Sequence, residues 1–151
     1  LKNFLLKETK NLIDRNIKLK IIGDKKKFTS GLQKILKSSE IKTYKNKGLQ
    51  INLALNYGSK QEILNSIKIL NKNKKKITEK NIEKNLYTKD IPNPDLLIRT
   101  GNTMRLSNFL LWQLAYTEIF FEKKLWPEFN KMDYIKILKK FKLKKRNFGA
   151  I

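Results

Sequence analysis

The sequence predicts an α/β protein with an open, mostly parallel sheet and flanking helices. Short apolar runs of strand length alternate along the chain with longer segments whose apolar residues recur at helical spacing. Residues typical of turns and helix caps separate these segments. Strands that alternate with helices form βαβ units, in which the strands run parallel. With 151 residues, the chain is predicted to form a single domain over residues 1–151.

The first third of the chain predicts two helices and two strands. Apolar residues at helical spacing indicate the helices, and the runs IKLKII and LQINLAL indicate the strands. Gly23 and Asp24 form a pair typical of the turn that ends the first strand. The helices are expected over residues 1–16 and from Thr29 or Ser30 to about residue 44, and the strands over residues 17–22 and 49–55.

Cap residues and prolines mark the remaining elements. The sequence SKQE at residues 59–62 has the pattern of a capping box. Pro92 and Pro94 favour an extended entry into the strand that follows them. Asn130 begins an N-cap pattern for a last helix. In chain order we expect helices over residues 59–70 and 78–86, a strand over residues 96–98, a helix from about Arg105 to Leu114, a strand over residues 115–121 and a helix after Asn130.

The composition excludes several kinds of chemistry. The chain has no Cys and no His, so it offers no disulfide, no thiolate and no imidazole base or ligand. A metal site would have to use carboxylates and phosphate oxygens, which suits Mg²⁺.

No apolar run approaches the ~20 residues that span a bilayer, and the chain starts without a signal-peptide pattern. The absence of Cys fits a cytoplasmic location.

The net charge is +22, from 35 basic and 13 acidic residues. Such a charge is typical of proteins that bind nucleic acid or an anionic membrane surface. The lysines, however, are spread along the whole chain and do not form one stripe, which favours solvated Lys on every polar face. We therefore expect no nucleic-acid partner, and peripheral contact with a membrane surface only as a by-product of the charge.

Arginine is rare in this chain, and two of its arginines follow the predicted strand at residues 96–98. Only four of the 35 basic residues are Arg, and Arg99 and Arg105 lie within seven residues of each other, with Ser107 close behind. A guanidinium matches phosphate oxygens as a planar fork, which Lys cannot do. Ligands of open α/β sheets bind beyond the carboxyl ends of strands. The pattern predicts an anion site, and the alternative is that both arginines are surface ion-pair partners.

Ser107 and the main chain beside it could add donors to this anion site. The Ser107 hydroxyl can donate to the same anion as the arginines. If a helix begins here, the N–H groups near Leu106 and Ser107 are unpaired and point to a bound anion. The alternative for Ser107 is a plain N-cap of that helix, and both roles could hold together.

Four blocks of sequence resemble one known family. They read NLALNYG at residues 52–58, DLLIRTG at 95–101, RLSNFLLWQ at 105–113 and LWPEF at 125–129. In this order they are similar to the C-terminal part of the cis-prenyltransferases, in particular the bacterial undecaprenyl diphosphate synthases (isoprenyl transferases). The resemblance implies an open, mostly parallel α/β sheet whose N-terminal part is missing from this sequence.

The resemblance also implies a reaction and its residues. Members condense isopentenyl diphosphate in cis onto an allylic diphosphate such as farnesyl diphosphate, making a long polyprenyl diphosphate carrier lipid, and they work as homodimers. By this resemblance Arg99, Arg105, Leu106 and Ser107 bind the diphosphate of isopentenyl diphosphate, and Glu118 binds the cofactor Mg²⁺. The alternatives for Glu118 are an ion pair with a neighbouring cation or an outward-facing strand position.

The sequence departs from the family pattern in two places. The family reads Thr-Gly-Gly-Glu where this chain has Asn102 and Thr103 after Gly101, although Asn tolerates a positive φ. The family's Asp-Gly-Asn-Gly-Arg loop, which carries the catalytic Asp, does not occur in this sequence. We therefore expect a C-terminal portion that is inactive alone. Arg146 and Gly149 resemble the basic ending of the family.

Two other functions stay open from the sequence. A basic α/β module could bind nucleic acid, in which case affinity should fall steeply with salt. The chain could also be a non-catalytic partner subunit of a prenyltransferase, although the presence of both arginines and Glu118 disfavours that alternative.

Overall fold

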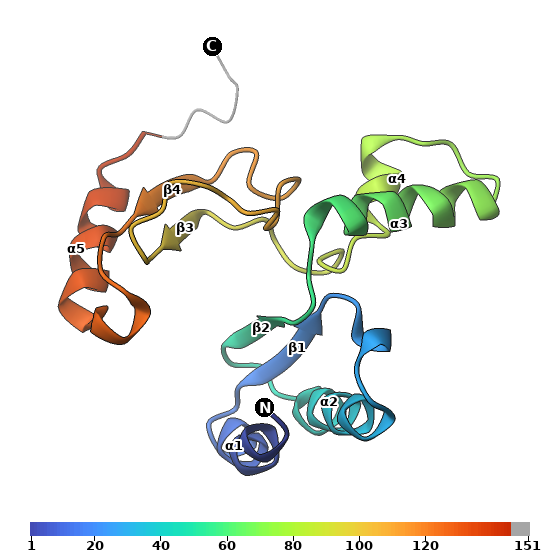
Figure 1. Cartoon of the computed structure of the whole chain (residues 1–151), viewed down its shortest axis with the longest axis horizontal. Coiled ribbons are helices and arrows are strands. Elements are labelled where there is room, and N and C mark those ends of the chain that lie inside the picture. The colour runs from blue at the N-terminus through green and yellow to red at the C-terminus, as the bar shows by residue number, and fades with distance from the viewer. Residues whose placement is uncertain (146–151) are drawn as a thin grey trace. The chain divides into compact units, whose positions relative to one another are not determined.

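The computed structural model describes residues 1–145 and divides the chain into two compact units, Leu1–Lys89 and Asp90–Ile151 (Figure 1). Each unit contains one two-stranded parallel sheet with helices beside it in the sequence. The predicted α/β class and the parallel pairing are confirmed, whereas the single domain stays a prediction. Arg146 and Gly149 lie outside the described residues. No helix within residues 1–145 is long and apolar enough to cross a bilayer.

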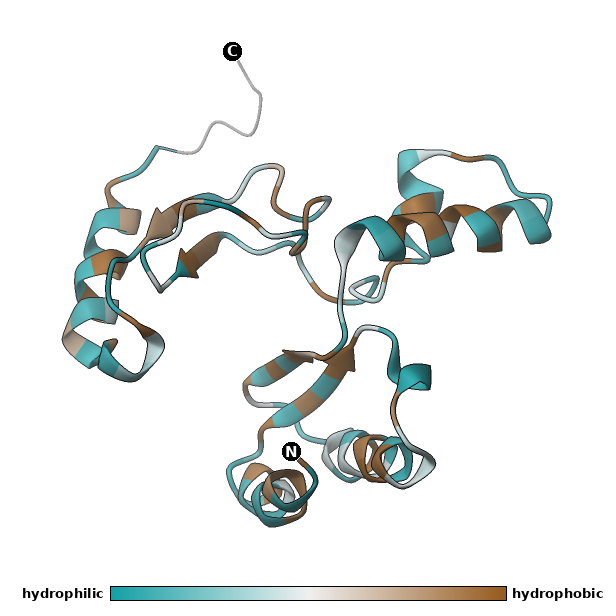
Figure 2. Ribbon diagram, viewed as in Figure 1, coloured by the Kyte–Doolittle hydropathy of each residue, from teal (hydrophilic) through white to brown (hydrophobic). Residues whose placement is uncertain are grey.

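Unit 1 follows the predicted order of elements. β1 and β2 pair in parallel, from Lys18 beside Gln50 to Ile22 beside Ala54. Figure 2 shows hydrophilic and hydrophobic residues alternating along β1, as expected of a strand with one face in the core. The elements are α1 (Lys2–Asp14), β1 (Lys18–Ile22), the short 3-10 helix η1 (Lys25–Lys27), α2 (Ser30–Thr43), β2 (Gln50–Ala54), α3 (Ser59–Lys72) and α4 (Glu79–Glu83).

The core of unit 1 lies where α1 and α2 pack against β1. Leu5 of α1, Leu36 of α2 and both Leu19 and Ile21 of β1 are buried together. Burying apolar side chains of this size contributes about 1.5–3 kcal/mol each, so this cluster fixes how the two helices sit on the strand.

The carboxyl ends of β1 and β2 are joined by main-chain and side-chain hydrogen bonds. The Asp24 N–H donates to the Asn56 carbonyl oxygen over 3.2 Å, and the Asn56 side-chain amide donates to the Asp24 carbonyl oxygen over 3.0 Å. Gly23 has a φ of 113°, and a Cβ added there would lie 2.1 Å from the Leu55 carbonyl oxygen. The turn predicted at Gly23 and Asp24 therefore needs glycine at its first position.

The capping box predicted at residues 59–62 is wrong. Gly58 is the N-cap of α3, and Ser59 is already the first helical residue. Glu62 does not face the helix start but is buried, with 1% of its surface exposed. Its carboxylate accepts hydrogen bonds from the Tyr57 hydroxyl over 2.5 Å and from the Tyr87 N–H over 2.6 Å. Charge-assisted hydrogen bonds of this kind outweigh a cap contact at the helix start.

We expect Glu62→Gln to destabilise the chain by roughly 1.5–3 kcal/mol, because the carboxylate is buried and accepts from two donors. The matched control is Glu79→Gln, which makes the same chemical change at an exposed position in α4 and should alter stability by less than about 0.5 kcal/mol. Urea unfolding followed by circular dichroism measures both free energies. Equal effects of the two substitutions would contradict a structural role for the buried carboxylate.

Unit 2 contains the second parallel strand pair. Leu96 of β3 lies beside Glu118 of β4, and Arg99 lies beside Phe121. The N-cap predicted at Asn130 is confirmed, and it is part of a capping box, because Asn130 and Asp133 each accept from the main chain of the other. The elements are β3 (Leu96–Arg99), β4 (Glu118–Phe121), the short 3-10 helix η2 (Trp126–Glu128) and α5 (Lys131–Lys142).

The helix expected from Arg105 to Leu114 is not formed. Residues 107–116 consist of bends and turns, and three residues within 105–114 have positive φ: Ser107 (48°), Asn108 (62°) and Leu110 (46°). A left-handed residue cannot continue a right-handed helix. Ser and Asn form local hydrogen bonds that compete with helix formation, and a short helix without an extensive packing face is marginal.

Candidate anion-binding site

Arg99 ends β3 and begins the loop that was predicted to bind an anion. The next residues turn the chain sharply, with φ of 92° at Gly101 and 52° at Asn102. Asn102 thus adopts the left-handed conformation that this residue type tolerates, as the sequence led us to expect. The loop after β3 keeps a tight turn although Asn stands where the family pattern has its second glycine.

The segment that follows β4 holds this loop in place through the main chain. The Gly101 N–H donates to the Lys124 carbonyl oxygen over 2.8 Å, and the Asn102 N–H donates to the Glu122 carbonyl oxygen over 3.1 Å. The Glu122 N–H donates in turn to the Arg99 carbonyl oxygen over 2.7 Å. The position of the loop after β3 therefore depends on residues that are twenty or more positions away in the sequence.

The guanidinium of Arg99 is oriented by three hydrogen bonds. Its Nε donates to the Thr103 hydroxyl oxygen over 2.8 Å. Its Nη1 donates to the Ser107 hydroxyl oxygen over 3.1 Å and also to the Arg105 carbonyl oxygen. A guanidinium has five N–H donors, so the two on Nη2 remain, and these donate to no acceptor within residues 1–145. An oriented cation with two available donors can bind a phosphate oxygen pair.

Arg105 adds a second cation at the same place. Its main chain contacts Arg99, and its exposed side chain makes no hydrogen bond or ion pair to any residue that the structure describes. This observation disagrees with the alternative that Arg105 is a surface ion-pair partner. Arg99 and Ser107 are in hydrogen-bond contact, as predicted. Only the main chain of Arg105 contacts Arg99, so the convergence of the Arg105 guanidinium on the same place stays a prediction.

The expectation of a helix start at Leu106 and Ser107 is wrong. No helix follows, so Ser107 is not an N-cap, and its hydroxyl instead accepts from Arg99. The Leu106 carbonyl oxygen accepts from the Phe109 N–H over 3.0 Å in a turn. Within the described chain the N–H groups of Leu106 and Ser107 donate to no acceptor, so these groups stay available without a helix dipole behind them.

Glu118 lies at the other end of the strand pair. It is the first residue of β4 and is paired with Leu96, whereas Arg99 is paired with Phe121, three residues further along. At about 3.3 Å per residue this separation is about 10 Å along the strand direction. Glu118 is half-buried and has no ion pair within residues 1–145, which disagrees with the ion-pair alternative.

The carboxylate of Glu118 is of the ligand type that Mg²⁺ prefers, and the magnesium-binding role of this residue stays a prediction. Among the described residues no group of three carboxylate, imidazole or thiolate side chains could hold a metal ion. Mg²⁺ is usually held by one or two carboxylates together with water and substrate phosphates, so a single Glu is a partial ligand set.

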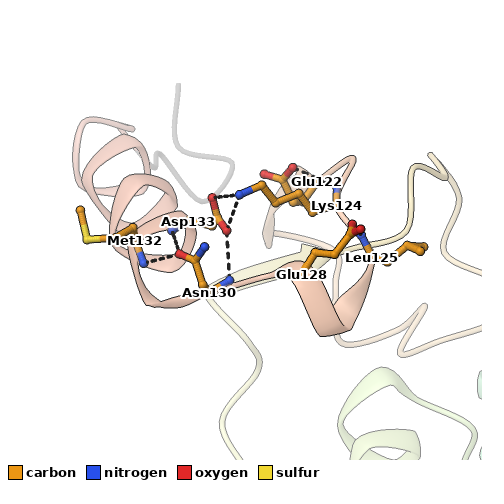
Figure 3. Close-up of polar contacts among 7 residues, drawn as sticks. All are labelled: Glu122, Lys124, Leu125, Glu128, Asn130, Met132 and Asp133. Carbon is orange, nitrogen blue, oxygen red and sulfur yellow. Dashed lines mark hydrogen bonds and ion pairs between the residues drawn. The ribbon is translucent and has the colours of Figure 1, made fainter.

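Sequence reasoning missed two contributors to this arrangement. One is Thr103, which orients Arg99. The other is the pair formed by Lys124 and Asp133, whose Nζ–Oδ distances are 2.7 and 2.9 Å (Figure 3). The hydrogen bond from Lys124 lowers the pKa of the Asp133 carboxyl, and the same bond raises the pKa of the Lys124 ammonium. A spacing of nine residues between opposite charges matches no periodic pattern, so the sequence did not predict this ion pair.

Unit 2 thus brings a guanidinium and a hydroxyl together beyond the carboxyl end of a parallel strand, which is where open α/β sheets bind their ligands. The chain belongs to the family described as putative undecaprenyl diphosphate synthase, whose model matches residues 1–149. The resemblance seen in the four sequence blocks is confirmed.

Individual relatives agree with this membership. The chain is 42% identical to an isoprenyl transferase of Oceanobacillus iheyensis, over 99% of this chain and 62% of that protein. It is 44% identical to the ditrans,polycis-undecaprenyl-diphosphate synthase ((2E,6E)-farnesyl-diphosphate specific) of Wigglesworthia glossinidia brevipalpis, over 90% of this chain and 55% of that protein. The chain therefore spans about three fifths of the length of the curated relatives that it matches.

Two solved structures share the fold. A probable undecaprenyl diphosphate synthase from Campylobacter jejuni matches with a TM-score of 0.88 and 35% identity, over 98% of this chain and 70% of that one. Lavandulyl diphosphate synthase from Lavandula x intermedia, in complex with dimethylallyl diphosphate, matches with a TM-score of 0.90 and 34% identity, over 99% of this chain and 68% of that one. The expected cis-prenyltransferase-like fold is confirmed.

Proposed function

We propose that this chain supplies the isopentenyl diphosphate site of a cis-prenyltransferase, which condenses isopentenyl diphosphate onto an allylic diphosphate such as farnesyl diphosphate. The observation that carries the proposal is the contact between Arg99 Nη1 and the Ser107 hydroxyl, beside the main chain of Arg105. Membership of the prenyltransferase family supports the same reaction. The product is a long polyprenyl diphosphate, a carrier lipid.

The residues of this chain act by binding and orienting the isopentenyl substrate. The two Nη2 donors of Arg99 and the exposed guanidinium of Arg105 bind its diphosphate, and the N–H groups of Leu106 and Ser107 add donors. A fixed diphosphate places the isopentenyl double bond for attack on the allylic carbon and replaces translational freedom with a defined orientation. The condensation also breaks the allylic carbon–oxygen bond, releases that diphosphate and removes one proton from the isopentenyl unit, and none of these steps is assigned to the binding residues of this site.

Glu118 is the residue that would contribute a carboxylate to Mg²⁺. When bound, Mg²⁺ stabilises negative charge on a diphosphate leaving group as a Lewis acid. The catalytic Asp of the family belongs to a loop whose sequence does not occur in these 151 residues. We therefore expect the chain alone to bind isopentenyl diphosphate without turning it over.

The partners follow from the same proposal. We expect a homodimer of the whole enzyme and a cytoplasmic location with peripheral contact at an anionic membrane surface, where the charge of +22 is attracted. Nucleic acid is not an expected partner, because the cations are spread over the chain and the two exceptional arginines are grouped on one loop.

Calorimetric titration of the 151-residue chain with isopentenyl diphosphate tests the proposal. Binding should be detectable, and isopentenol, which lacks the diphosphate, should not bind. Radiolabelled isopentenyl diphosphate should give no product with the chain alone, and incorporation of label would contradict the expected inactivity. If gel shifts with DNA or RNA at two salt concentrations show a steep salt dependence while prenyl diphosphates do not bind, the chain is a nucleic-acid-binding module instead.

A further inference from the structure

Lys124 connects two parts of unit 2 through two different groups. Its main-chain carbonyl oxygen accepts from Gly101 in the loop after β3, over 2.8 Å. Its side-chain ammonium donates to both carboxylate oxygens of Asp133 in the first turn of α5 (Figure 3). One residue therefore joins the loop that carries Arg99 to the start of a helix.

The Asp133 end of this connection is itself fixed. Asp133 Oδ2 accepts from the Asn130 N–H over 3.0 Å, while Asn130 Oδ1 accepts from the Met132 N–H over 2.8 Å and from the Asp133 N–H over 3.2 Å. This reciprocal capping holds the Asp133 carboxylate in one place relative to the helix. Lys124 therefore binds to a fixed acceptor and not to a mobile surface carboxylate.

The side chains of Lys124 and Asp133 are both partly accessible to water, with 43% and 17% of their surfaces exposed. Ion pairs in such positions contribute little to stability, because water screens the attraction and ordering long side chains opposes it. A pair that adds little stability can still fix geometry. Here it keeps the Lys124 ammonium at the two carboxylate oxygens of Asp133 and so restricts where the main chain of Lys124 can lie. We therefore expect the pair to affect the position of the groups that contact the main chain of Lys124.

We propose that Lys124 and Asp133 are positioning residues for the diphosphate site, holding the loop after β3 so that the guanidinium of Arg99 is aimed by Thr103 and Ser107. The inference rests on the proposed function of that site. Without the pair, Lys124 loses its hydrogen bonds to α5, so we expect the carbonyl oxygens of Glu122 and Lys124, which accept from Asn102 and Gly101, to be held less firmly.

The test separates positioning from simple attraction between charges. Lys124→Met should weaken binding of isopentenyl diphosphate by roughly tenfold, and Lys124→Arg, which keeps the contact with Asp133, should restore it. The matched control is Lys123→Met, which removes the same charge from the neighbouring exposed residue and should change affinity less than about twofold. Asp133→Asn is the decisive variant, since attraction alone predicts tighter binding of an anion when a negative charge is removed, whereas positioning predicts weaker binding.

A second measurement does not need the ligand. In the ¹⁵N-labelled chain, the Arg99 Nε–H should exchange slowly with water because it donates to Thr103, and Lys124→Met should make this exchange faster while Lys123→Met leaves it unchanged. Equal weakening by Lys124→Met and Lys123→Met, tighter binding by Asp133→Asn, or unchanged exchange at Arg99 in Lys124→Met would each overturn the proposal. If the unsubstituted chain does not bind isopentenyl diphosphate, the proposed function fails, and the exchange experiment still decides whether the pair positions Arg99.

Discussion

Replacing Arg99 with Lys is expected to weaken binding of isopentenyl diphosphate by about 10–100-fold, although the charge is kept. Arg99 uses three N–H donors to contact Thr103, Ser107 and the Arg105 carbonyl oxygen, and it has two more on Nη2 for the ligand. The three donors of a Lys lie on one nitrogen, so they cannot make the contacts to the protein and also bind the ligand. Hydrogen bonds to charged groups contribute about 1.5–3 kcal/mol each, and 1.4 kcal/mol corresponds to a factor of ten in affinity.

Calorimetry measures this loss, and Arg15→Lys provides the matched control. Arg15 is exposed at the end of α1 in the other unit, so the same substitution there should leave affinity unchanged. Arg105→Lys should weaken binding by a smaller factor than Arg99→Lys, because the Arg105 side chain contacts no described residue and only the ligand contact would change. Unchanged affinity in both Arg99→Lys and Arg105→Lys would remove the diphosphate clamp.

Local patterns in the sequence predicted most elements of the fold. The strands β1 and β2 follow from apolar runs, and α5 begins after the predicted N-cap Asn130. The capping-box pattern failed at Ser59, because the Glu62 side chain accepts from two half-buried donors, Tyr57 and Tyr87, which a local pattern does not include. Helix signals at caps are therefore reliable only where no distant partner competes for the same side chain.

The candidate site was predicted in part. Arg99 and Ser107 lie in one short stretch after a strand, so the sequence could place them together. The backbone between them could not be predicted, since the apolar residues of 105–114 suggested a helix while positive φ values at Ser107 and Asn108 produce a turn. The hydrogen bond from Gly101 to Lys124 joins residues far apart in the sequence, and no periodicity indicates such a contact.

Gly23→Ala is expected to destabilise the chain by about 3–5 kcal/mol, among the largest effects of any single substitution here. Gly23 has a φ of 113°, which side chains with a Cβ rarely adopt, and the added carbon would lie 2.1 Å from the Leu55 carbonyl oxygen. That oxygen belongs to the main chain at the carboxyl end of β2, so the contact cannot be relieved by a side-chain rotation. The strands β1 and β2 would have to separate at this end, which removes the hydrogen bonds between Asp24 and Asn56.

Gly31→Ala is the matched control, because it adds the same carbon at a position where the carbon causes no steric conflict. Gly31 lies in the first turn of α2, and a Cβ there meets nothing within 4 Å. Alanine has the higher helix propensity, so this substitution should stabilise the chain by up to about 1 kcal/mol. Urea unfolding of both variants gives the two free energies. Equal stabilities would mean that the loop after β1 does not lie against Leu55, and the close approach of the two strand ends would then be wrong.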